Sequence, residues 1–153
     1  MKHQKSRTTL ALLLGVSIIT AANLASAQLD ASLVLRPKNY RPYQASHKEL
    51  VGYGKQLFKD PKLSTNGSSC NSCHVNHGAF QAGFSKPYPH PVAMAKDKLS
   101  ISKIHLDEMV QACMVIPMSA KPLPWNSKEL AALTAYTSEI QKNFVAGKAT
   151  PNP

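Results

Sequence analysis

Two cysteines and a histidine stand together in the segment CNSCH, residues 70–74. On one turn of chain the thiols of Cys70 and Cys73 can each add to a vinyl group of one haem, and the adjacent His74 is then held beneath the iron as proximal ligand. A Cys70–Cys73 disulfide is the plain alternative. A thioredoxin-like pair would need a strand–helix–strand setting that this sequence lacks, and a zinc site would need a second ligand pair. The spacing therefore predicts one covalently attached haem c.

A sulfur donor for the opposite face of the iron is offered by QACMVIPM, residues 111–118. A thiolate is a stronger donor than a thioether and its charge stabilises ferric iron, so we expect Cys113 to bind where both sulfurs reach, with a low reduction potential. Met118 stays open as the alternative ligand, and a buried apolar role or an intermolecular disulfide stays open for Cys113. His77 is only three residues from His74 and cannot easily reach the opposite haem face. His47, His90 and His105 could reach it in principle, but we interpret them as surface or propionate-side residues.

Helices are predicted to position these segments. The first starts at Ser46, where SHKE forms a capping box, and runs to Phe58. The second covers roughly residues 100–114 and places Cys113 on its buried face, because apolar side chains recur at i, i+3, i+4 and i+7. The intervening loop at 76–97 is long enough that we expect it to wrap a cofactor.

The last helix begins after Asn126 or Ser127 and carries an apolar stripe that ends at Phe144. Two glycines inside the first helix, Gly52 and Gly54, indicate that another helix crosses it closely. No stretch predicts a strand. The expected fold class is therefore all-α, a single domain of three to five helices around one covalent haem.

The first 27 residues have the order of a secretory signal peptide: basic residues, an apolar run at 10–19, and small residues at Ala25 and Ala27. The run is too short to span a bilayer, which disfavours an uncleaved membrane anchor, and no second apolar segment follows. We therefore expect export to the periplasm or an equivalent compartment, with no membrane span after cleavage. The expected divisions are a signal peptide at 1–27, an extended N-terminal arm at 28–45, a cytochrome c domain at 46–145 and a flexible C-terminal tail at 146–153.

The 153 residues include 18 Lys and Arg against 8 Asp and Glu, a formal charge of +10. Removal of residues 1–27 takes away three of the basic side chains and leaves a charge of about +7 on 126 residues, enough for one small domain. Such a surface favours docking to an acidic redox protein. The lysines are scattered with little aromatic interleaving, which together with export argues against a nucleic-acid partner.

The pattern GYGKQLF, then CNSCH, then LPWNSKELAALTAY resembles a class I cytochrome c over about residues 46–143. This resemblance implies that the first and last helices cross, with Gly54 and Phe58 against Leu133 and Tyr136. The string QACMVIPMSAKPLPWNSKELAALTAY is similar to thiosulfate dehydrogenases and to the catalytic cytochrome subunit of the sulfur-oxidising Sox system. In those proteins a cysteine at the position of Cys113 gives its sulfur to the haem. The small His/Cys monohaem cytochromes of anaerobic ammonium-oxidising bacteria are similar as well.

We expect a monohaem cytochrome that acts in redox, or that binds CO or NO at a labile distal thiolate after reduction. The alternatives are a one-electron carrier with a His/Met haem and a haem subunit of a thiosulfate-oxidising complex. The sequence shows no recognisable acid, base or second haem, so we do not expect an enzyme acting alone. We expect a homodimer or a complex with a second haem subunit, and the arm at 28–45 is the sequence hint for a partner.

Overall fold

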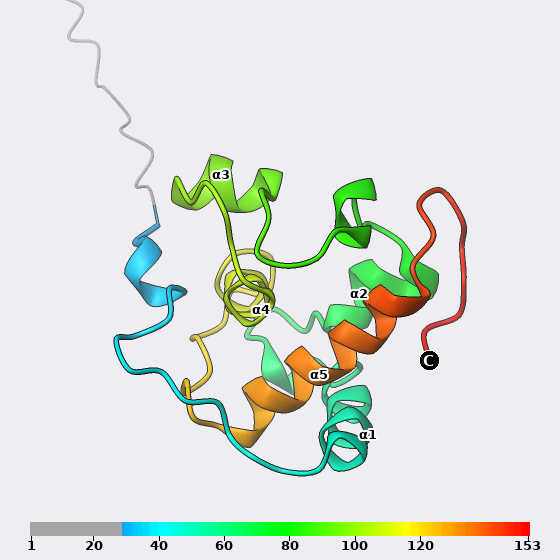
Figure 1. The fold of residues 1–153 in the computed structure, drawn as a ribbon, viewed down its shortest axis with the longest axis horizontal. Helices are drawn as coiled ribbons and strands as arrows, with labels where there is room; N and C mark the ends of the chain where they lie inside the picture. Colours follow the sequence, from blue (N-terminus) through cyan, green and yellow to red (C-terminus); the bar gives the residue numbers. More distant parts are fainter. Residues whose placement is uncertain (1–28) are drawn as a thin grey trace, which may run out of the picture.

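A computed structural model describes residues 29–153 (Figure 1), so the predicted signal peptide at 1–27 lies outside the described residues. The five helices are α1 (His47–Leu57), α2 (Cys70–His74), α3 (Ala93–Leu99), α4 (Leu106–Val115) and α5 (Lys128–Asn143). Short 3-10 turns accompany them: η1 (Ala31–Leu33), η2 (Pro61–Leu63), η3 (Val75–His77) and η4 (Ala82–Ser85). Within the described range the β structure consists of one isolated bridge between His90 and Ile104. The all-α prediction is confirmed.

The crossing of α1 and α5 is the centre of the fold (Figure 1). Gly54 makes the approach possible, because a Cβ atom there would overlap the carbonyl oxygen of Ala132 and lie 2.7 Å from the Cβ of Tyr136. One turn further on, the ring of Phe58 meets the ring of Tyr136 edge to face, with centroids 5.3 Å apart. The predicted contact of Gly54 and Phe58 with the last helix is therefore present.

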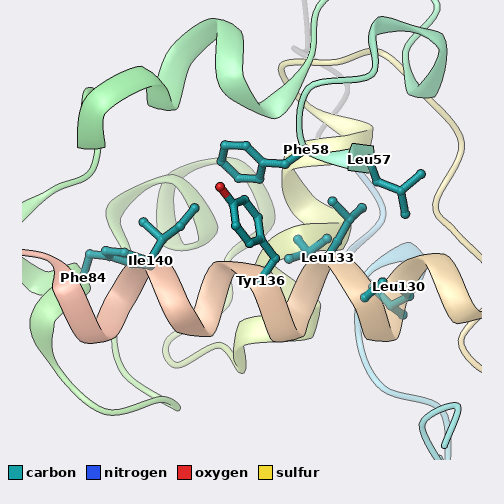
Figure 2. Close-up of a cluster of buried hydrophobic side chains, with 9 residues drawn as sticks. Leu57, Phe58, Phe84, Leu130, Leu133, Tyr136 and Ile140 are labelled. Carbon is teal, nitrogen blue, oxygen red and sulfur yellow. The ribbon is translucent and has the colours of Figure 1, made fainter. Parts of the chain in front are cut away.

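The main hydrophobic cluster forms around this crossing (Figure 2). The inner face of α5 contributes residues at helical spacing, all at most 1% exposed: Leu130, Leu133, Tyr136 and Ile140. Leu57 and Phe58 at the end of α1, and Phe84 from η4, pack against them. Burial of this apolar face stabilises α5 and fixes its position, since helical stability in proteins comes mainly from packing of the apolar face.

A second cluster fixes α4, the helix that carries Cys113. Ala112 of α4 packs with side chains from the N-terminal arm, α3 and the segment after it: Val34, Ala95, Leu99, Ile101 and Ile104. The arm is also held electrostatically, because the guanidinium of Arg36 lies 2.8 Å from the carboxylate of Asp107, whose side chain is 4% exposed. The backbone N–H of Arg36 donates to Oε1 of Glu108 over 3.0 Å. The described part of the arm therefore lies on α4.

The second predicted helix begins later than expected. Ser100 adopts a left-handed φ of 57° and ends α3. The chain then bends at Ser102 and Lys103 before the bridge, where the Ile104 N–H donates to the His90 carbonyl over 3.1 Å. The N–H of His105 donates to Oε2 of Glu108 over 2.8 Å, so α4 starts at Leu106 rather than near residue 100. Helix α3 begins inside the segment 76–97 that the sequence predicts as a loop, and it ends two residues beyond it.

The last helix follows its prediction closely. Oγ of Ser127 accepts the N–H of Leu130 over 3.2 Å, which identifies Ser127 rather than Asn126 as the N-cap. The helix ends at Asn143, and the chain then turns back toward α2 (Figure 1). None of the helices between residues 29 and 153 is long and apolar enough to cross a membrane.

Candidate haem-binding site

The CNSCH segment forms α2, a helix of 5 residues that is tied to the end of α1. The N–H of Asn71 donates to the carbonyl of Phe58 over 2.9 Å. At the start of the helix the N–H of Ser69 donates to Oγ of Ser72 over 3.0 Å. A helix of this length is unstable in isolation, so these bonds are what hold the two cysteines and the histidine on one turn.

Cys70, Cys73 and Cys113 form no disulfide with one another, and the charges of the first two influence the third. Burial raises the pKa of the half-buried Cys70 to about 11, whereas Cys73 is exposed. Burial also raises the pKa of Cys113 to about 12, with smaller contributions from the charges of Cys70 and Cys73, so the sulfurs are within electrostatic reach of one another. In the described part of the chain, no group of three His, Cys, Asp or Glu could hold a bare metal ion.

The Cys113 side chain lies deep in the protein but keeps some accessible surface. Its thiol is strongly desolvated by the surrounding protein, yet the residue is only half-buried by its accessible surface. Cys113 is therefore neither sealed in a closely packed core nor open to bulk solvent. Tyr88 lies nearby, because its pKa is raised to about 12 by its own burial and then by the charge of Cys113.

His74 is held in the form that ligates a metal. Its Nδ1 lies 2.9 Å from the carbonyl oxygen of Gly78, which accepts only from a protonated Nδ1 and so leaves the lone pair on Nε2. Burial lowers the pKa of the imidazole, against a smaller opposite effect of the Gly78 bond, and favours the neutral ring. Phe80 stacks on the ring with centroids 3.9 Å apart and fixes its plane.

These features fit a haem c. Two thiols lie on one turn, a neutral imidazole follows them directly, and a third sulfur on a separate helix lies within electrostatic reach of the two thiols. Met118, the alternative donor, is 3% exposed, and its N–H donates to the Cys113 carbonyl over 3.2 Å. Cys113 is half-buried. Both sulfurs therefore stay candidates for the distal position.

The remaining candidates of the sequence have other surroundings. Nε2 of His47 lies 2.8 Å from the Glu139 carboxylate on the surface, and His90 takes part in the bridge to Ile104. His105 is the N-cap residue of α4. Met94 and Met109 pack against the second hydrophobic cluster, Trp125 packs against the first, and Tyr88 packs against both.

Three positioning contacts have no signal in the sequence. The Gly78 carbonyl orients His74, and Phe80 stacks on it. Gln111, 0% exposed, exchanges two hydrogen bonds with the backbone of Leu123, of 2.7 and 2.8 Å, and so binds the segment after Met118 to α4. Each of these contacts joins residues that are far apart in the sequence or that belong to no recognisable motif. Periodicity and spacing therefore cannot predict them.

The helical fold and this donor set define a c-type cytochrome domain. Residues 53–143 match the family described as SoxA/TsdA, cytochrome c domain, and the chain belongs to this family. Its cofactor is covalently bound haem c, as the sequence predicted.

A curated relative bears on the wider function. The chain is 29% identical over 110 residues to the thiosulfate dehydrogenase of Stutzerimonas stutzeri (strain A1501), an alignment that covers 67% of this chain and 35% of that protein. The chain thus spans about a third of the length of this relative. No solved structure matches the chain. The haem redox class is established by the family, whereas the activity of the longer relative is not thereby transferred.

Proposed function

We propose that the chain is an exported monohaem cytochrome in which Cys70 and Cys73 attach the haem, His74 is the proximal ligand and Cys113 is the distal ligand. The observation that carries this assignment is the Cys113 thiol, which is desolvated and lies within electrostatic reach of the two attachment cysteines. The resemblance of the surrounding QACMVIPM segment to His/Cys cytochromes supports the same ligand.

The haem, the Gly78 carbonyl and Cys113 make separate contributions at this site. The haem supplies a one-electron couple and a coordination position when bound. The Gly78 carbonyl holds the proton on Nδ1 of His74, which strengthens the donor at Nε2. Cys113 offers a negative sulfur to ferric iron, and its apolar surroundings favour a neutral thiol whenever the sulfur is released. We therefore propose a low potential and a distal position that opens to CO or NO after reduction.

The ligand assignment is tested by the ferric absorption and EPR spectra of Cys113→Ala and Met118→Leu. We expect wild type and Met118→Leu to share a low-spin thiolate spectrum, because leucine keeps the volume of the buried methionine. Cys113→Ala should lose it. An unchanged spectrum in Cys113→Ala, or a spectrum lost only in Met118→Leu, would assign the distal position to Met118 and make the chain a His/Met carrier.

Ligand binding is tested on dithionite-reduced protein. We expect CO and NO each to displace the distal sulfur and shift the Soret band, and Cys113→Ala to bind CO faster because nothing has to be displaced. A ferrous spectrum inert to both gases would favour the simple electron carrier. CO binding by Cys113→Ala but not by wild type would show that a strong distal ligand blocks the iron. CO binding by neither protein would show that the haem pocket itself is closed.

A second candidate function is that of a haem subunit in sulfur oxidation. It is favoured by the SoxA/TsdA family and by the similarity to a thiosulfate dehydrogenase, although the chain spans only 35% of that protein. Addition of thiosulfate to the ferric protein tests it: reduction of the haem by thiosulfate alone would show catalytic competence. Reduction that requires a second haem protein would identify a subunit role.

Export and docking complete the proposal. The order of basic, apolar and small residues in 1–27 supports cleavage after Ala27, and N-terminal sequencing of protein from the periplasmic fraction would show Gln28 first. The excess of Lys and Arg supports an acidic redox partner. Electron transfer to such a partner should then slow steeply as ionic strength rises, whereas a salt-independent rate would exclude electrostatic docking.

A further inference from the structure

The segment that follows α5 folds back over the haem-attachment helix. A turn at Gly147, with a φ of 77°, reverses the chain, and the N–H of Lys148 donates to the Val145 carbonyl over 3.1 Å. The N–H of Thr150 donates to the carbonyl of Asn76 over 3.3 Å. We call residues 145–153 the C-terminal strap. The family match ends at residue 143, so the strap lies beyond the part of the chain that defines the family.

Asn152 is the residue through which the strap holds α2. Its Nδ2 donates to the carbonyl of His74 over 2.9 Å and lies 3.5 Å from Oδ1 of Asn71. Its Oδ1 accepts the N–H of His77 over 3.3 Å. One amide side chain therefore bonds to the end of α2 on one side and to the turn that follows on the other.

The turn that Asn152 holds is unfavourable without support. Asn76 and His77 have left-handed φ values of 49° and 63°, a conformation that costs non-glycine residues of the order of 1 kcal/mol each. The last carbonyls of a helix also lack partners within it, and Asn152 supplies one for His74. These contacts keep the chain in the conformation that brings Gly78 back to the imidazole.

The turn held by Asn152 is connected directly to the residue that orients the proposed proximal ligand. Gly78 follows His77 directly, and its carbonyl accepts the proton on Nδ1 of His74 over 2.9 Å. The same bond sets the orientation and the donor strength of the imidazole. Loss of the Asn152 side chain frees the His77 N–H and the His74 carbonyl together. The turn is then held by fewer bonds, chiefly that of the Gly78 N–H to the Val75 carbonyl over 2.9 Å, and the Gly78 carbonyl is less firmly placed.

We propose that the C-terminal strap is a positioning element for the proximal ligand, with Asn152 as its positioning residue. The strap strengthens the His74 donor through Gly78 and thereby stabilises the ferric state. The proposal rests on the proposed role of His74 as the proximal ligand. A second bond anchors the strap independently of α2, since the hydroxyl of Tyr136 donates to the carbonyl of Pro153 over 2.8 Å.

The test measures the reduction potential of holoprotein carrying Asn152→Ala, with Thr150→Ala as matched control. The bond of Thr150 uses its backbone N–H, which alanine keeps. Weakening one hydrogen bond corresponds to a three- to fivefold shift toward ferrous protein at a fixed potential, or a rise of about 30–40 mV. We expect Thr150→Ala to match wild type.

Covalent haem on a denaturing gel, the ferric spectrum and the melting temperature separate the outcomes. A wild-type potential in Asn152→Ala, whether or not its melting temperature falls, would reduce the strap to a structural role. A wild-type ferric spectrum that lacks histidine ligation would instead overturn the assignment of His74 on which the proposal rests. If Asn152→Ala does not retain haem, Tyr136→Phe decides, because it keeps the ring and frees only the far end of the strap. A rise in the potential of Tyr136→Phe that is smaller than the rise expected for Asn152→Ala supports the proposal, and an unchanged potential refutes it.

Discussion

Gly54→Ala tests the crossing that organises the fold. An added methyl group would overlap the carbonyl oxygen of Ala132 and lie 2.7 Å from the Cβ of Tyr136. Both neighbours belong to the body of α5, so a change of rotamer cannot relieve the overlap. The two helices have to separate by about 1 Å to restore ordinary contact distances, and a gap of that size forfeits a quarter to a half of the dispersion energy of the atoms on either side.

The expected magnitude follows from two opposing effects. Overpacking of a core costs about 1–3 kcal/mol, and an obstacle of helix backbone places Gly54 near the upper end of that range. Alanine is a better helix former than glycine by about 1 kcal/mol, which offsets part of the loss. The free energy of unfolding should therefore fall by about 2 kcal/mol, equivalent to a fall of the melting temperature by roughly 8 °C for a domain of this size.

Gly52→Ala is the matched control, because Gly52 lies in the same helix and a Cβ atom there would meet nothing within 4 Å. It should raise the free energy of unfolding by about 0.5–1 kcal/mol through helix propensity alone. Thermal and denaturant unfolding of the haem-loaded variants, followed by far-UV circular dichroism, measures both. Equal stabilities of Gly54→Ala and Gly52→Ala would refute the close crossing.

Two further predictions concern the contact of the arm with α4. Arg36→Ala leaves the Asp107 carboxylate, which is 4% exposed, without its guanidinium partner. The free energy of unfolding in denaturant should fall by about 1–2 kcal/mol, a value reduced for solvent screening because the Arg36 side chain is 37% exposed. Arg41→Ala, at an exposed position of the same arm, should leave the stability unchanged. Tyr40 has its pKa raised to about 12, first by burial and then by Asp107, so the folded chain keeps this proton while the unfolded chain releases it near pH 10. Stability should thus fall as pH rises from about 10 to 12, and a fall of the same steepness in Tyr40→Phe would contradict the assignment.

Local chemistry in the sequence predicted much of this molecule. The capping box at Ser46 and the stripe of the last helix located α1 and α5 to within one or two residues, because caps and apolar periodicity are local properties. The spacing of Cys70, Cys73 and His74 likewise needed only the geometry of one turn. The prediction was wrong between 93 and 105, where α3 is short and where the bridge to His90 keeps the residues before α4 extended.

Only the tertiary structure decided how the separate parts of the site meet. The sequence places Cys113 on a helix, but the electrostatic link of its sulfur to Cys70 and Cys73 arises because the packing around α5 and the arm brings α4 to α2. The bond of Asn152 to His74 joins residues 78 positions apart and leaves no pattern in either segment. Contacts of this kind depend on how helices pack and on where a chain turns back, and these are properties of the whole domain.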